Sequence, residues 1–237
     1  MKSTTLKGLS VLLLSSFLAG CQSTETKEVE NTPEAETKAV NNESSKSEHN
    51  HSHVHDEDAE KIYAGYFEDS QVQDRALSDW EGDWQSVYPY LLDGTLDEVF
   101  EHKAQQNGDK TAEEYKAYYD IGYKTNTERI VIEGNNVTFY ENGKAFTGEY
   151  EADGYEILNY EAGNRGVRFI FKLTEPADKL PQYIQFSDHS ISPTKADHYH
   201  IYWGDDRKAL LEEVTNWPTY FPTDMDGHTI AHDMIAH

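Results

Sequence analysis

Three histidines near the C-terminal end of the sequence have types and spacing suited to holding a metal ion. Eight residues separate His189 from His198-Tyr199-His200. His198 and His200 are two residues apart, so they project from one face if this segment is a strand. Neutral imidazole nitrogen suits Zn²⁺ and ions of similar preference, and three such ligands leave a fourth position for water or another group. This pattern predicts a three-histidine metal site.

Other histidines are weaker candidates for metal binding. Four of them alternate along an acidic stretch, at His49, His51, His53 and His55. A His-rich tract is a compositional signal for metal binding, although a solvated polar linker is the alternative interpretation. His228 and His232 lie one helical turn apart and could chelate a metal together, and His237 follows as a further auxiliary candidate. Exposure on a frayed terminal helix is the simpler interpretation of this last set. His102 stands alone in an expected helix, where a structural or solvated role is the simpler interpretation.

Composition argues against a nucleic-acid-binding protein and against a fold stabilised by intrachain disulfides. The 237 residues carry 44 acidic against 20 basic side chains, a net charge of −24, so a nucleic-acid surface is not expected. The one cysteine, Cys21, cannot form an intrachain disulfide.

The first 21 residues resemble a bacterial lipoprotein signal. Lys2 and Lys7 precede a short apolar run that ends in Leu18-Ala19-Gly20-Cys21, the pattern after which cleavage exposes a cysteine for acylation. We therefore expect lipidation at Cys21 and anchoring to a membrane without spanning it. An ordinary secretory signal is the alternative. Gln22 favours retention at the inner leaflet of the outer membrane if the cell has two membranes, so a periplasmic location is expected.

Residues 22–60 are expected to form a disordered, acidic, His-rich linker. They hold eleven acids against three lysines and no aromatic residue, so they cannot bury enough apolar surface to fold. Residues 61–237 hold the long periodic segments and are expected to form one metal-binding domain.

The elements that must position the histidines are mostly strands. Short alternating segments separated by turn residues recur from Thr127 onward, which predicts an antiparallel sheet closed or nearly closed into a barrel. The strands are expected at 129–132, 136–140, 145–150, 155–160, 166–173, 182–188 and 198–203. A further strand is expected where Trp80, Gly82, Trp84, Ser86 and Tyr88 alternate.

Helices are expected beside these strands. They are placed at 60–77 in part, 96–103, 111–121, 206–214 and 226–236. Thr111 followed by Glu114 forms a capping-box pattern at the start of one of them. The predicted hairpin brings His189, at the end of one strand, beside His198 and His200 on the next, at one mouth of the barrel.

Several long stretches of this chain are similar to the ZinT family of periplasmic zinc- and cadmium-binding proteins. The similar stretches are 72–80, 84–89, 166–169, 183–189, 216–220 and 234–237. The resemblance implies a mainly β fold, a calycin- or lipocalin-like antiparallel barrel with accessory helices. The Gly82-x-Trp84 opening agrees with this fold. The resemblance to the family also implies that His189, His198 and His200 are the metal ligands. A His-rich N-terminal stretch is common in the family.

The resemblance has two departures. Some relatives carry a cysteine pair at places that correspond here to Gly148 and Leu173, so that crosslink is absent. Well-known relatives are also soluble after signal cleavage, whereas Cys21 predicts a tethered protein.

The expected function is capture of Zn²⁺, with Cd²⁺ or other divalent transition metals as further candidates, and its delivery to a zinc uptake system during zinc limitation. The expected partner is the substrate-binding protein of a zinc ABC transporter, and metal-linked self-association is a second candidate interaction. We expect no enzymatic activity. The main alternative is a zinc-dependent hydrolase or hydratase that uses the fourth coordination position, and a barrel for an apolar small molecule is the third.

Overall fold

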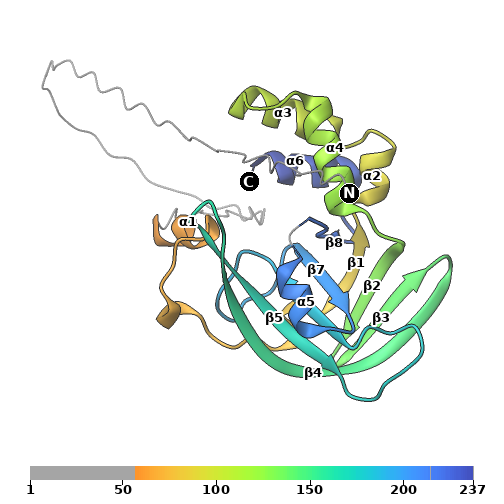
Figure 1. Cartoon of the computed structure of the whole chain (residues 1–237). Coiled ribbons are helices and arrows are strands. Elements are labelled where there is room, and N and C mark those ends of the chain that lie inside the picture. The colour runs from red at the N-terminus through yellow and green to blue at the C-terminus, as the bar shows by residue number, and fades with distance from the viewer. Residues whose placement is uncertain (1–56, 214, 237) are drawn as a thin grey trace, which may run out of the picture. The chain divides into compact units, whose positions relative to one another are not determined.

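The computed structural model describes residues 57–213 and 215–236, and its central feature is a closed barrel. Eight antiparallel strands pair in chain order from β1 to β8, and β8 pairs with β1 to close the barrel. Figure 1 shows this barrel with most of the helices gathered at one end. The predicted antiparallel barrel with accessory helices is therefore confirmed. The strands are β1 (Gly82–Ser86), β2 (Thr127–Glu133), β3 (Asn136–Glu141), β4 (Lys144–Asn159), β5 (Arg165–Leu173), β6 (Tyr183–Ser187), β7 (Tyr199–Gly204) and β8 (Thr219–Pro222).

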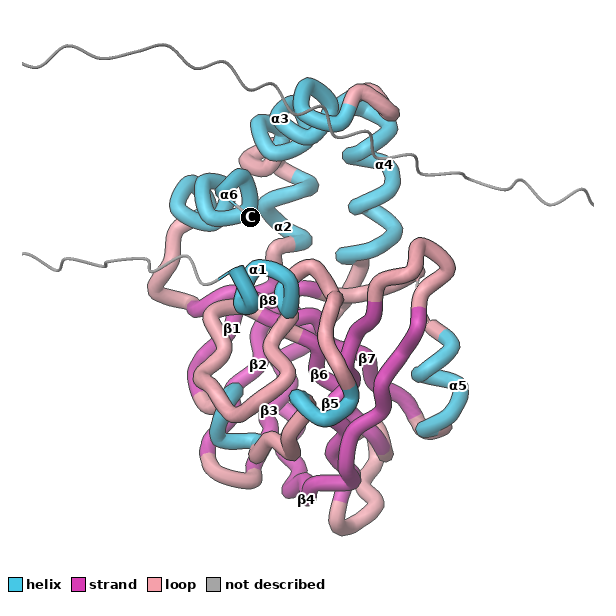
Figure 2. The backbone as a smooth tube through the Cα atoms, turned by 90° about the vertical axis from the view of Figure 1, so that its left-hand side faces the viewer, coloured by secondary structure: helices cyan, strands magenta, loops and turns pink. Residues whose placement is uncertain are grey.

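Helices α2, α3, α4 and α6 cover one end of the barrel, while α5 lies on its side (Figure 2). The helices are α1 (Glu57–Tyr63), α2 (Tyr88–Leu92), α3 (Asp97–Asn107), α4 (Ala112–Tyr123), α5 (Arg207–Glu212) and α6 (Gly227–Ala236). The capping box predicted at Thr111 is present, since its side chain accepts from the Glu114 backbone N–H and Glu114 accepts from the Thr111 N–H. Among the described residues, no helix has the length and apolar character needed to cross a membrane.

The interior of the barrel is filled with aromatic side chains. Trp80, in a short 3-10 turn before β1, is fully buried and stacks on Phe186 with ring centroids 4.8 Å apart. Phe169 and Phe171 of β5 also pack against the Trp80 ring. Because these rings occupy the core, the barrel interior offers little support for the third alternative, the binding of an apolar small molecule.

A second buried cluster joins the helices to the barrel end. Its most buried side chains, each at most 2% exposed, are Leu91 of α2, Leu96 just before α3, Phe100 of α3 and Ile230 of α6. Phe221 of β8 belongs to the same cluster. The helices are therefore held on the barrel by a core of their own, which fixes the end where the histidines lie.

The segment 60–77 is helical in part, as predicted: α1 ends at Tyr63, a 3-10 turn spans Asp69–Gln71 and another begins at Leu77. Other details of the prediction were wrong. The alternation from Trp80 to Tyr88 overstates β1, because Trp80 belongs to a 3-10 turn and Pro89 lies in the first turn of α2. The strands expected at 145–150 and 155–160 are one strand, β4, interrupted by a register shift between Ala152 and Tyr155. The short strand β8 was not predicted.

The register shift in β4 has a structural use. Gly154 adopts φ +79, which favours glycine, and allows the strand to bulge without ending. Arg207 of α5 donates its Nε–H to Asp153 at 2.6 Å and an Nη1–H to Glu156 at 2.9 Å. The bulge thereby presents two carboxylates that hold α5 on the side of the barrel.

Candidate metal centre

His189, His198 and His200 converge at the end of the barrel covered by the helices. One ring nitrogen of each lies within 4.8 Å of those of the other two. Zn–N bonds are about 2.0–2.1 Å long, so a small inward rotation of the imidazoles brings all three to one ion. The three residues are thus brought together as their spacing predicted, across the β6–β7 connection.

His200 presents its Nε2 atom to the site because of Thr219. The Thr219 hydroxyl donates to the Trp217 carbonyl at 3.0 Å and lies 2.7 Å from His200 Nδ1. A hydroxyl has one hydrogen, so Oγ1 accepts from the His200 Nδ1–H, and Nε2 keeps its lone pair. Hydrogen bonding of this kind fixes the tautomer and orientation of metal-ligating histidines.

The charge state of His200 also suits a ligand. Burial lowers its pKa well below the ordinary value, and the neighbouring His189 and His198 lower it further. A neutral imidazole is the form that binds metal.

His189 and His198 each stack on an aromatic ring. His189 lies against Tyr63 of α1, with ring centroids 4.4 Å apart and planes 21° apart. His198 lies against Phe221 of β8 at 5.0 Å and 11°. His189 has φ +64, an uncommon left-handed conformation for a residue other than glycine, and this turns the chain sharply at the end of β6.

A buried arginine holds the loop that carries His189. The Arg75 side chain is fully buried and donates to Asp188 Oδ1 at 2.6 Å, to Asp79 Oδ2 at 2.8 Å and to the Thr194 carbonyl at 2.7 Å. Its guanidinium also lies 4.0 Å from the centre of a Trp80 ring. Burial raises the pKa of Asp188, and the Arg75 guanidinium opposes that rise. Arg75 therefore connects the segment before β1 to the β6–β7 loop.

Backbone hydrogen bonds support the same connection. The Gln73 N–H donates to the Ile191 carbonyl at 2.9 Å, and the Ala196 N–H donates to the Asp79 carbonyl at 2.8 Å. The loop between the first and second histidines is thus attached at several points to one preceding segment. The position of His189 follows from these attachments as well as from the hairpin.

A cavity of about 580 Å³ opens over the three histidines. Its walls come from α1, α3, α4, α6 and β8 as well as from the histidine loop. Aromatic residues dominate the walls, and Lys103 and Asp233 are the charged groups among them. Burial lowers the pKa of Lys103. The cavity gives a small solute access to the histidine cluster.

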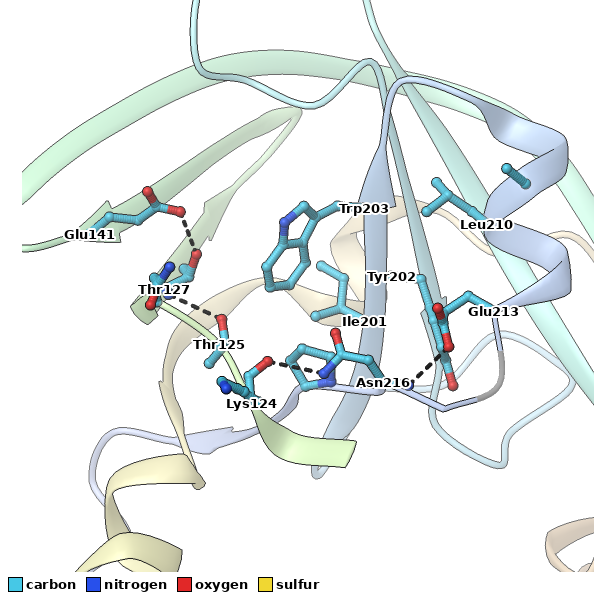
Figure 3. Close-up of a pocket in the computed structure, with 13 residues that line it drawn as sticks. Lys124, Thr125, Thr127, Glu141, Ile201, Tyr202, Trp203, Leu210, Glu213 and Asn216 are labelled. Atoms are coloured by element: carbon cyan, nitrogen blue, oxygen red, sulfur yellow. Dashed lines mark hydrogen bonds between the residues drawn. The ribbon is translucent and has the colours of Figure 1, made fainter. Parts of the chain in front are cut away.

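A different pocket, of about 430 Å³, lies beside β7 and α5 (Figure 3). Its polar groups are largely paired with one another: Thr127 donates to Glu141 at 2.8 Å, and the Asn216 amide donates to the Lys124 carbonyl at 3.0 Å. Its lining includes no histidine or cysteine. This pocket has no ligand set for a soft or borderline metal.

Of the other histidines considered as metal candidates, His228 and His232 lie exposed on α6. Cys21, the tail histidines His49, His51, His53 and His55, and His237 lie outside the described residues. His102 lies half-buried on α3. Tyr63, Arg75 and Thr219 were not predicted as site residues; the similar stretches at 72–80 and 216–220 contain the last two and were the available signal.

The profile of a family described as ZinT (YodA) periplasmic lipocalin-like zinc-recruitment matches residues 43–237. The chain belongs to the ZinT family. The probable metal-binding protein YrpE of Bacillus subtilis (strain 168) is 60% identical over 245 residues, which cover 98% of each chain. The resemblance noted in the sequence is therefore confirmed.

Other ZinT relatives are parts of longer proteins. The zinc-binding lipoprotein AdcA of Streptococcus pneumoniae serotype 4 is 48% identical over 182 residues, which cover 76% of this chain and 36% of AdcA. The chain thus spans about a third of the length of that relative. The crystal structure of the Zn(II)-bound ZinT-like domain of S. pneumoniae AdcA matches with a TM-score of 0.71 at 49% identity, over 73% of this chain and 97% of that domain. The Zn(II)-bound AdcA structure matches with a TM-score of 0.73 over 74% of this chain and 38% of AdcA.

Proposed function

We propose that this ZinT-family protein captures Zn²⁺ through His189, His198 and His200. The observation that carries the proposal is the convergence of three ring nitrogens within 4.8 Å. The hydrogen bond between Thr219 and His200 Nδ1 leaves His200 Nε2 available to a metal. The family is described as zinc-recruiting, and the similar AdcA proteins are named zinc-binding. Both facts support Zn²⁺ as the cargo, while Cd²⁺ and other divalent transition metals remain candidates as competing ions.

The site is tested by zinc binding to the full chain. In His198→Ala/His200→Ala, two of the three imidazoles are lost, so the tightest zinc ion should disappear from a competition titration with a chromogenic chelator. His102→Ala, which removes an imidazole from α3, should keep that ion. Unchanged stoichiometry and affinity in the double variant would place the tight site elsewhere.

We propose further that the protein works outside the cytoplasm, attached to a membrane through a lipid on Cys21. The lipobox at 18–21 supports this proposal, and so do the periplasmic description of the family and the name zinc-binding lipoprotein given to AdcA. Residues 22–60 would then act as the linker between lipid and barrel, with the histidines from His49 to His55 as a weak, exchangeable metal store. Residues 61–237 form the capture domain in this scheme. Incorporation of labelled palmitate, lost in Cys21→Ser, tests the anchor.

The proposed recipient of the zinc is the substrate-binding protein of a zinc ABC transporter, acting during zinc limitation. AdcA supports this proposal, because AdcA is a longer zinc-binding protein and one region of it is similar to this chain. Zinc transfer from the loaded protein to such a partner, measured by mass spectrometry, tests it. Transfer no faster than release into a chelator would contradict direct delivery.

The alternative of a zinc hydrolase or hydratase has no support from the family or from the similar proteins, which are described as zinc-recruiting, metal-binding or zinc-binding. We propose that the protein is not an enzyme. A hydrolase and hydratase screen of the zinc-loaded protein, with the double histidine variant as control, tests this proposal.

A further inference from the structure

The exposed surface of α6 carries two histidines that are not part of the three-histidine cluster. His228 and His232 are four residues apart and both exposed, so they lie one above the other on the helix surface. Their Nε2 atoms are 3.2 Å apart, and their ring centroids are 4.4 Å apart. The two Nε2 atoms thus lie within hydrogen-bond distance of each other on the exposed surface of α6.

This distance is the one that a shared metal ion requires. With Zn–N bonds of about 2.0–2.1 Å and a tetrahedral angle, two ligating nitrogens lie about 3.3–3.4 Å apart. The 3.2 Å separation of the two Nε2 atoms therefore matches the spacing of two ligands on one ion, which would replace the hydrogen bond between them. The helix supplies the geometry, and no loop has to be ordered for it.

A carboxylate from a neighbouring helix supports His228. Glu98 Oε1 of α3 lies 3.4 Å from His228 Nδ1. With the proton on Nδ1, beside this carboxylate, Nε2 keeps a lone pair for a metal. The Thr219 hydroxyl lies closer to Nδ1 of His200, at 2.7 Å, in the triad of His189, His198 and His200.

We propose that His228 and His232 form a second metal site, which binds one borderline divalent cation such as Zn²⁺, Ni²⁺ or Cu²⁺. Imidazole nitrogen suits these ions, and water completes the coordination. With two protein ligands at an exposed position, the site binds more weakly and exchanges faster than a site with three. It does not depend on the triad, since it uses none of the same residues.

The test is a Ni²⁺ titration of the full chain, first loaded with one equivalent of Zn²⁺. The background protein replaces by serine the histidines that could bind Ni²⁺ elsewhere, namely His49, His51, His53, His55 and His237. In this background His232→Ala should lose one Ni²⁺ ion, measured by equilibrium dialysis. Glu98→Gln should lower the affinity for that ion by roughly tenfold or more, as loss of a carboxylate behind a ligating histidine does. His102→Ala should leave the titration unchanged.

A second measurement locates the ion. Paramagnetic Ni²⁺ should broaden the amide signals around Thr229 in the NMR spectrum of the background protein and leave them sharp in His232→Ala. Equal Ni²⁺ binding and equal broadening in the two proteins would overturn the proposal. The triad is judged separately, because His198→Ala/His200→Ala should lose the tight zinc ion and still bind Ni²⁺ at α6.

Discussion

The Thr219 hydroxyl decides which nitrogen of His200 faces the cavity. It accepts from Nδ1–H because its own hydrogen goes to the Trp217 carbonyl. Thr219→Val keeps the shape and removes the acceptor, so the tautomer and ring orientation are no longer fixed. We expect zinc affinity to fall roughly 10- to 100-fold, the range seen when such supporting groups are lost. A chelator competition titration measures the change.

Thr138→Val is a matched control for this prediction. Thr138 is paired with Thr147 on the exposed face of β3 and β4, at 2.9 Å between hydroxyl oxygens. The control should leave zinc affinity unchanged. A loss of affinity as large as that of Thr219→Val would show a general effect on the barrel, and full affinity in Thr219→Val would remove the orienting role.

Sequence spacing revealed the histidine cluster better than it revealed the residues that support it. His189, His198 and His200 were visible because an alternating pair and a third histidine across a hairpin have few other simple explanations. Thr219 and Tyr63 approach the site from elements distant in sequence, and a threonine or tyrosine carries no comparable signal. Contacts of this kind depend on how the barrel closes, which spacing along one segment cannot specify.

The strands show the same limit at the level of elements. Period-two alternation located most of them, but the break expected between strands at 145–150 and 155–160 is a bulge within β4. A left-handed glycine serves both purposes, and only pairing with β5 distinguishes them. Strand β8 has four residues, follows Pro218 and ends at Pro222, and proline normally argues against a strand. Its pairing with β1 and β7 overrides that preference.

The connection between the segment before β1 and the β6–β7 loop depends on Arg75. Arg75→Met leaves the carboxylate of Asp188 buried without its cationic partner. Loss of one member of a buried ion pair costs about 3–5 kcal/mol, so the free energy of unfolding should fall by that order. Urea unfolding measures it. Zinc affinity should fall as well, because the loop that carries His189 loses its attachment to the segment 73–80.

Arg129→Met provides the comparison. Arg129 pairs with Asp83 between β2 and β1, but both side chains are about two-fifths exposed. Ion pairs exposed to solvent contribute roughly 0–1 kcal/mol, so this change should barely alter stability. If the two arginine variants unfold at the same urea concentration, the buried connection does not stabilise the fold as argued.

On the scale of the whole molecule, the charge and the site act together. The net charge of −24 attracts divalent cations over distances of about a Debye length, roughly 10 Å at 0.1 M salt. The triad then selects by ligand type, because carboxylates alone favour harder ions. Attraction by the surface is therefore sensitive to salt, whereas retention by three imidazoles in a half-enclosed cavity is much less so.

Zinc should stabilise the folded protein through this retention. The ligands come from the β6–β7 hairpin and meet only in the native state, so binding raises the free energy of unfolding by RT ln(1 + [Zn²⁺]/Kd), about 2.7 kcal/mol at 100 times Kd. For a domain of this size that corresponds to an increase in Tm of roughly 5–10 °C. Differential scanning calorimetry with chelator-buffered zinc measures it. His198→Ala/His200→Ala should lose this increase at the same free zinc, and an equal increase in that variant would mean that the stabilising ion lies outside the triad.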